Sequence, residues 1–250
     1  MYDNLNIKNS IIITGGNKGI GLEITKSFLN QNYTVIVGGR SQIKLRDKNL
    51  FFVKCDLTKY SSHEKLVKIA KKNSSNLVAY INNIGISEWR KIERVENKFL
   101  NKMINTNLIS YFWGCKVAKK YIKKGSIINI SSIAGKRGSK NNSVYSATKF
   151  AVNGMTQSLA KEFGSKNLRV NAVCPVLIKT SGLVQALKKK DSPGYRNVQS
   201  FLNKFKINNV ALKDFPKAKD VGDLCIFLVS NKSKSITGQC INLDSGVFPQ

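Results

Sequence analysis

The 250-residue sequence is short of acidic residues, of histidine and of long apolar runs. It has 14 Asp and Glu against 42 Lys and Arg, and its single histidine is His63. One histidine excludes a catalytic or metal site that needs two or more of them. No apolar run approaches the roughly 20 residues that cross a bilayer, and the first ten residues lack the apolar core of a signal peptide. We therefore expect a cytoplasmic chain that does not enter a membrane.

Cysteine is present without a metal-ligand pattern. The five cysteines show no CxxC spacing, and their odd number leaves one unpaired in any disulfide scheme: Cys55, Cys115, Cys174, Cys225 and Cys240. Reduced thiols and the absence of a metal site are expected. His63 stands in "SSHE", which predicts a capping box at the start of a helix and a solvated imidazole.

The formal net charge of +28 leaves two interpretations open. Lysines occur along nearly the whole chain, in short runs such as "AKKYIKKG", with no basic tail and no dense arginine cluster. A phosphate-binding arm would need such a cluster. This favours a drift in composition and no nucleic-acid partner, with a functional polyanion site as the alternative.

The order of apolar segments predicts the fold. With 42% hydrophobic and 9% aromatic residues, the chain can form a large core. Ile- and Val-rich runs such as "SIIITGG", "TVIVGGR" and "SIINISS" alternate with amphipathic segments, which predicts a parallel sheet buried on both faces. Helices are expected from about Ile20, from about Ser62, over Asn97 to Tyr121 and from about Tyr145. We expect a doubly wound α/β (Rossmann) fold in one domain, residues 1–250.

Two further segments bear on ligands. "TGGNKGIG", Thr14 to Gly21, follows the first strand and opens a helix, which is the setting of a turn that binds a dinucleotide pyrophosphate. About twenty residues on, where an acidic residue would bind the ribose of NAD, the chain has Arg40. A guanidinium suits a 2′-phosphate, so the pattern favours NADP(H), with Lys18 as a second positive charge.

These motifs together resemble the short-chain dehydrogenase/reductase family along essentially the entire chain. "TGGNKGIG" resembles its cofactor turn, "CDL" its adenine contact and "NNIG" its NNAG motif; "MINTNLIS", "INISSIAG" and "YSATK" resemble its catalytic segments. The resemblance implies these cofactor contacts: Gly15, Asn17, Lys18, Gly19, Ile20, Gly21, Arg40, Asp56, Leu57, Asn83, Gly85, Tyr145, Lys149 and Thr180. It implies four catalytic residues: Asn107, Ser132, Tyr145 and Lys149.

The resemblance also implies their roles. Tyr145 is expected to exchange a proton with the substrate oxygen, and Lys149, four residues on along a helix, to lower the pKa of Tyr145 and to hold the nicotinamide ribose. Ser132 is expected to hydrogen-bond the carbonyl, and Asn107 to position a water beside Lys149. The aromatic residues nearby, Tyr111, Phe112 and Trp113, are interpreted as packing or subunit contacts.

The function expected from the resemblance is NADP(H)-dependent interconversion of a ketone and a secondary alcohol by a homodimer or homotetramer. The alternative is a non-catalytic dinucleotide-binding regulator or scaffold. Residues 179–215 are irregular and are expected to cover a carbonyl substrate, small or carrier-bound. Their excess of lysine leaves two interpretations open: attraction of an anionic substrate, or a share in the lysine excess of the whole chain. Val176 and Ser245 depart from the Pro-Gly and Asp-Gly-Gly patterns of the family.

Overall fold

The computed structural model describes residues 9–249. Residues 1–8 and Gln250 lie outside the described part, and so does most of the segment for which no signal peptide is expected. Its centre is a sheet of seven strands in the order β3-β2-β1-β4-β5-β6-β7, with every neighbouring pair parallel. The strands are β1 Asn9–Thr14, β2 Thr34–Gly39, β3 Leu50–Lys54, β4 Asn76–Asn82, β5 Gly125–Ile130, β6 Leu168–Pro175 and β7 Cys240–Leu243. The predicted doubly wound α/β fold is confirmed.

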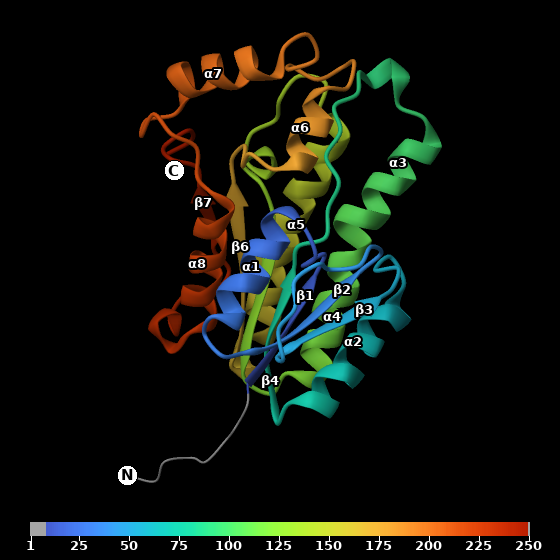
Figure 1. Cartoon of the computed structure of the whole chain (residues 1–250), viewed down its shortest axis with the longest axis vertical. Coiled ribbons are helices and arrows are strands. Elements are labelled where there is room, and N and C mark those ends of the chain that lie inside the picture. Colours follow the sequence, from blue (N-terminus) through green and yellow to red (C-terminus); the bar gives the residue numbers. More distant parts are fainter. Residues whose placement is uncertain (1–8, 250) are drawn as a thin grey trace.

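Helices cover both faces of this sheet (Figure 1). Their bounds are α1 Gly19–Leu29, α2 Tyr60–Asn73, α3 Asn97–Ile104, α4 Ser110–Tyr121, α5 Ser143–Phe163, α6 Ser181–Leu187, α7 Val198–Asn209 and α8 Ala218–Val229. One core packs α2, α4 and α5 against the sheet, and the other packs α1 and α8 on the opposite face. Strands such as "SIIIT" read as continuous apolar runs because both of their faces are buried.

Strand order places the two most informative loops together. The chain runs outward from β1 to β3 and then returns to β4, which lies beside β1. The loops after β1 and β4 therefore leave the sheet at its switch point, where ligands bind in folds of this kind. Figure 1 shows α6 and α7 beyond the same end of the sheet.

The long helix predicted over Asn97 to Tyr121 contains a change of winding. A π turn, Asn105–Ile109, separates α3 from α4 and contains Asn107. Single π turns inside α-helices are frequent at functional sites, because the extra residue changes which side chains share a face.

The interpretation of His63 is wrong. Helix α2 begins at Tyr60, its N-cap Lys59 makes no side-chain capping bond, and His63 is fully buried. Its Nε2–H donates to the Leu57 carbonyl at 2.8 Å, and its Nδ1 accepts from the Tyr80 hydroxyl at 2.7 Å. The earlier helix start turns His63 toward β4, where Tyr80 supplies a partner that the local sequence does not show.

Within residues 9–249, no helix combines the length and the apolar character needed to cross a bilayer.

Candidate active site

The glycine-rich turn after β1 has the backbone that a pyrophosphate cradle requires. Gly15 and Gly19 have φ of +68° and +54°, which residues with a side chain rarely adopt. A Cβ on Gly21 would lie 2.3 Å from the Gly15 carbonyl oxygen, so only glycine fits there. The turn leads into the N-terminus of α1, whose first N–H groups lack helical partners. Residues of this kind fit a dinucleotide phosphate.

Asn83 at the end of β4 braces this turn. Its Nδ2 donates to the carbonyls of Thr14 and Gly15 at 3.0 and 3.1 Å. Its backbone N–H donates to the Thr14 hydroxyl at 2.9 Å. Thr14 was not among the predicted site residues, although it opens the motif; its buried hydroxyl ties the two switch-point loops together.

The two cations predicted to bind a 2′-phosphate lie on the surface beside the turn. Arg40 and Lys18 are exposed, and Asn17 donates from Nδ2 to the Ser41 carbonyl and hydroxyl, each at 2.8 Å. Asn17 thereby joins the glycine-rich turn to the loop that carries Arg40. Near the end of β3, hydrogen bonds from Thr58 hold the pKa of Asp56 below its usual range, and the neighbouring Leu57 is buried.

Ser132 and Tyr145 meet at the carboxyl end of the sheet. Ser132 follows β5, and its Oγ accepts from the Ala134 N–H at 3.1 Å. A hydrogen bond with the Ser132 side chain lowers the pKa of Tyr145, but desolvation raises it more, so the net shift is upward. Tyr145 therefore keeps its proton near neutral pH.

Lys149 lies near Tyr145 but is not among the groups that shift the pKa of Tyr145. Its Nζ lies 5.8 Å from the centre of the Tyr145 ring and donates to the Ile130 carbonyl at 2.8 Å. Burial lowers the pKa of Lys149 to about 8, because the charged form loses water. Desolvation is the largest influence on the pKa of both groups, and the expectation that Lys149 lowers the pKa of Tyr145 stays a prediction.

Asn107 braces the loop after β4. Its Oδ1 accepts from the Ile86 N–H and its Nδ2 donates to the Ile86 carbonyl, each at 2.9 Å. A Cβ on Gly85 would lie 3.6 Å from Asn107 Oδ1 and 4.0 Å from Lys149 Nζ, so Gly85 stands against both. The structure thus gathers Gly85, Asn107 and Lys149 around one point.

Thr180 lies next to the glycine-rich turn. Its Oγ1 accepts from the Leu183 N–H at 3.2 Å and so caps α6. Its Cγ2 would lie 3.6 Å from a Cβ on Gly19. Predicted residues from both halves of the chain therefore converge on the turn, and their roles in binding and catalysis stay predictions.

The segment 179–215 forms α6 and α7 and is fastened to the loop after β4. Trp89 on that loop packs with Ala186, Leu187 and Leu202. Glu88 binds Lys189, and Asp191 accepts from Arg94 Nη1 at 2.6 Å. Two of the charges in this segment are thus paired with residues outside it.

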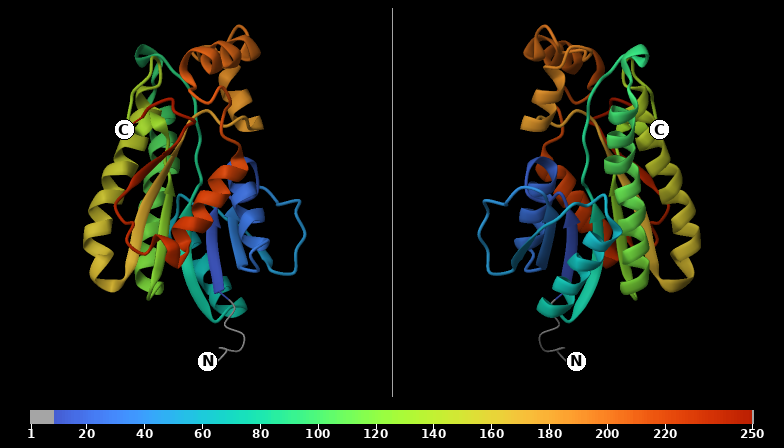
Figure 2. Two further views of the ribbon diagram at one scale, coloured as in Figure 1. Left: turned by 90° about the vertical axis from the view of Figure 1, so that its left-hand side faces the viewer. Right: turned by 90° about the vertical axis from the view of Figure 1, so that its right-hand side faces the viewer.

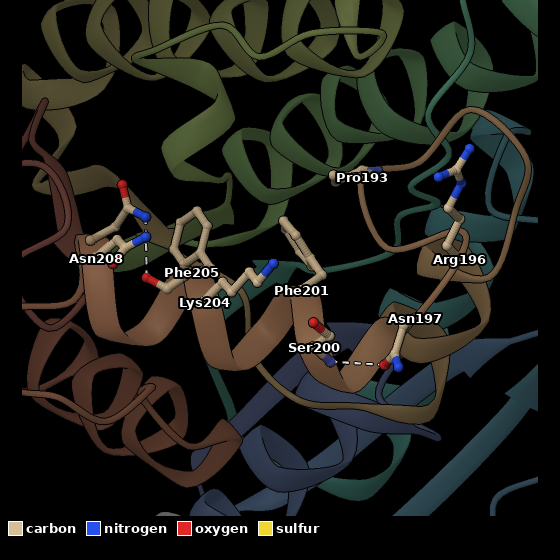
Figure 3. A pocket seen from close by; sticks show the side chains of 9 residues that line it. Pro193, Arg196, Asn197, Ser200, Phe201, Lys204, Phe205 and Asn208 are labelled. Atoms are coloured by element: carbon tan, nitrogen blue, oxygen red, sulfur yellow. Dashed lines mark hydrogen bonds between the residues drawn. The ribbon is translucent and has the colours of Figure 1, made fainter.

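A hollow of about 370 Å³ lies along α7 (Figure 3). Phe201 and Phe205 project from one side of the helix, and Arg196 stands on the loop before it (Figure 3). Lys204 also lines the hollow, which includes none of the predicted catalytic residues. It combines apolar rings with two cations.

The two departures from the family pattern are accommodated locally. Ser245 has a φ of +53°, a left-handed conformation that glycine adopts more easily, and its carbonyl accepts from the Leu212 N–H. Val176 is partly buried against Ile133, Ala172 and Cys174. Among the described residues, no group of three His, Cys, Asp or Glu side chains could hold a metal ion, and all five cysteines are free.

Comparison with known proteins identifies the class to which this fold and site belong. The family model for short chain dehydrogenases matches residues 9–191, and the chain is a member of that oxidoreductase family. The chain is 30% identical to a 3-oxoacyl-acyl-carrier-protein reductase of Buchnera aphidicola, over 96% of this chain and 98% of that one. It is also 30% identical to an (S)-acetoin-forming diacetyl reductase of Staphylococcus epidermidis, over 96% and 99%.

A solved structure gives the same result for the fold. The aldohexose dehydrogenase of Thermoplasma acidophilum superposes with a TM-score of 0.87 at 26% identity, over 97% of this chain and 98% of that one. These three proteins are named for different substrates, an acyl-carrier ketone, a diketone and a sugar. Membership of the family therefore leaves the substrate to be argued from the site.

Proposed function

We propose that this chain is an NADP(H)-dependent oxidoreductase that reduces a ketone to a secondary alcohol. The observation that carries the proposal is the meeting of Ser132, Tyr145 and Lys149 beside a glycine-rich turn built for a dinucleotide. A scaffold or sensor would need the turn but would have no use for a protonated phenol held by a serine hydroxyl.

The proton chemistry follows from the pKa shifts. The raised pKa of Tyr145 keeps the phenol protonated, so it is an acid for a developing alkoxide and a poor base. This favours the reductive direction near neutral pH. Ser132, beside the phenol, is placed to donate to the same substrate oxygen. Nicotinamide, when bound, supplies the hydride.

Cofactor preference is proposed from charge. Arg40 and Lys18 are exposed beside the turn, and the residue before Arg40 is Gly39 instead of an acid. In the proposed site both cations face the adenosine 2′-phosphate, while Asn17 and Ser41 join the two loops that carry them. Asp56 and Leu57 line the adenine end, and Thr180 the nicotinamide end.

The substrate class is proposed from the segment 179–215 and the relatives. Arg196 and Lys204 line the hollow that contains the Phe201 and Phe205 rings, and Lys188 and Lys190 are exposed in the same segment. This combination suits an acyl chain attached to an anionic carrier. A relative at 30% identity is named for such a substrate. A small carbonyl or a sugar is the second candidate.

We also propose that the chain acts as a homodimer or homotetramer. Phe112 on α4 and Phe150 on α5 are 44% and 48% exposed, although they are large apolar side chains. Figure 2 shows these two helices side by side, so the exposed rings extend over one helical layer that a second copy could cover.

The test is a screen of 3-oxoacyl thioesters, diketones and ketoses for loss of NADPH absorbance, with Tyr145→Phe as the matched variant. The variant keeps the ring and the cofactor cradle but lacks the acid, so turnover should fall at least about 100-fold while NADPH affinity is kept. NADPH binding without any carbonyl-dependent turnover by the parent would support the sensor alternative. Activity of Tyr145→Phe within about tenfold of the parent would remove Tyr145 as the acid.

A further inference from the structure

Tyr111 touches the candidate site although the proposed chemistry gives it no role. It lies on α4, four residues after Asn107, and its side chain is fully buried. Its hydroxyl donates to the Ile130 carbonyl at 2.8 Å. That carbonyl belongs to the last residue of β5, two residues before Ser132.

Lys149 shares this acceptor. Its Nζ lies 2.8 Å from the Ile130 carbonyl oxygen, 3.4 Å from the Tyr111 hydroxyl oxygen and 5.0 Å from the centre of the Tyr111 ring. A carbonyl oxygen has two lone pairs and can accept from both donors. The three groups therefore form a closed triangle of polar contacts, in which Lys149 Nζ lies 5.8 Å from the centre of the Tyr145 ring.

The orientation of the Tyr111 hydroxyl follows from its surroundings. Burial, and secondly the neighbouring Tyr145, raise the pKa of Tyr111 well above that of a free phenol. Tyr111 therefore keeps its proton and directs it to Ile130. Its remaining lone pairs are available to Lys149, and the ammonium form donates stronger, charge-assisted hydrogen bonds to the Tyr111 hydroxyl and the Ile130 carbonyl than a neutral amine would.

We propose that Tyr111 is a positioning residue for Lys149: its hydroxyl, together with the Ile130 carbonyl, favours the ammonium form and fixes its place beside Tyr145. The inference rests on the proposed function, which gives Lys149 its contact with the cofactor. It differs from the sequence interpretation, in which Tyr111 only packs.

The other groups around Lys149 leave this role to Tyr111. The titratable side chains that face it are Tyr145 on its own helix, Tyr111 on α4 and Cys174 on β6, and Cys115 faces Tyr111 in turn. No ion pair involving Lys149 is found within residues 9–249. Desolvation favours the free amine, and Cys174 opposes it electrostatically. The hydrogen-bond acceptors within reach of Nζ are the Ile130 carbonyl and the Tyr111 hydroxyl.

The test uses Tyr111→Phe, which keeps the ring beside Nζ and removes only the oxygen. The control is Tyr80→Phe, because Tyr80 is another fully buried tyrosine but bonds His63. NADPH affinity is measured by fluorescence titration from pH 6 to pH 9 without substrate, and kcat is measured over the same range.

In the parent, NADPH affinity should fall as Lys149 loses its charge near pH 8. In Tyr111→Phe this fall, and the basic limb of kcat, should move to lower pH by roughly 0.5 to 1 unit, since a weak hydrogen bond to the cation is lost. Tyr80→Phe should leave both midpoints in place, even if it lowers stability.

Midpoints that are the same in Tyr111→Phe and the parent would overturn the inference while leaving the proposed function intact. Equal shifts in both variants would also overturn it, because loss of any buried hydroxyl would then suffice. A parent that binds no dinucleotide at any pH would overturn the proposed function and this inference with it.

Discussion

His63 makes the stability of the protein depend on pH between about pH 5 and pH 8. It is the only histidine of the chain, and no other side chain has an ordinary pKa between pH 5 and pH 8. Burial lowers the pKa of His63, because the imidazolium would lose water. A charged His63 could also no longer accept the Tyr80 hydroxyl proton at Nδ1.

The direction and size of this pH dependence follow from the linkage between proton binding and folding. In the unfolded chain His63 binds a proton below about pH 6.5, whereas in the folded chain it resists protonation to lower pH. The contribution of His63 to the free energy of unfolding is therefore fully present well above pH 6.5. It is lost as the pH falls from there toward the folded-state pKa. One proton gives up to about 1.3 kcal/mol between pH 7 and pH 5.5, or roughly 2 to 5 °C in the midpoint of thermal unfolding.

The assay is thermal unfolding from pH 5 to pH 8 in the parent and in the double variant His63→Leu, Tyr80→Phe. The double variant replaces both polar partners by apolar groups, so its midpoint should be level between pH 5.5 and pH 7. A parent with no slope in that interval would show that His63 is not held away from water. A double variant with the parent's slope would assign the titration to another group.

Three further predictions test the cofactor site, the backbone and the segment 179–215. Arg40→Ala should weaken NADPH binding by about 10 to 150-fold and leave NADH binding unchanged, whereas Arg46→Ala on the same loop should change neither; calorimetric titration of both cofactors checks this. Ser245→Gly should raise the midpoint of thermal unfolding by roughly 1 to 2 °C, because the strain of the left-handed backbone exceeds the entropy that glycine adds to the unfolded chain; a lower midpoint would contradict this. Replacing Lys188 and Lys190 with Gln should lower kcat/KM for an anionic carbonyl and weaken its dependence on salt, with kcat and a neutral analogue unaffected; an unchanged ratio of anionic to neutral substrates at all salt concentrations would make the lysines compositional.

The residues at the carboxyl end of the sheet could be predicted because each follows a strand directly. "TGGNKGIG" after β1, "NNIG" after β4 and "SS" after β5 are fixed to neighbouring strand ends once the strands are recognised. Parallel strands bring such ends to one edge whatever the length of the intervening helices. The order of the chain thus predicted which residues would meet.

Contacts between side chains of different helices and strands could not be predicted in the same way. The burial of His63 depends on Tyr80, seventeen residues away on β4, and on a helix start two residues earlier than expected. Helix α8 was not predicted at all, although it packs on α1. In each case the deciding contact is tertiary, and the local pattern does not contain it.

Tyr111 lies between these two cases. It was expected to make a packing or subunit contact, whereas its hydroxyl and Lys149 Nζ both donate to the Ile130 carbonyl, at the end of a strand that the local pattern around Tyr111 does not show. The only sequence signal was that Tyr111 follows Asn107 by four residues, which places both on one helix face. That spacing does not by itself predict a contact between Tyr111 and Lys149. The pKa shifts could not be predicted from the sequence either, since desolvation, the largest cause for Tyr145 and for Lys149, depends on the tertiary burial of both side chains.

In the proposed function, substrate choice is set by residues 179–215, away from the groups that deliver the proton. Relatives named for an acyl-carrier ketone and a diketone match this chain over nearly all of their length, and the fold of an aldohexose dehydrogenase superposes on it. In this chain α6 and α7 contact the scaffold through Trp89, through Glu88 with Lys189 and through Asp191 with Arg94. These contacts do not involve Ser132, Tyr145 or Lys149. We therefore expect, from the proposed function, that changes on α6 and α7 alter what is bound without altering how a proton is delivered. Exchange of residues 179–215 with those of a relative should therefore alter KM far more than the pH dependence of kcat.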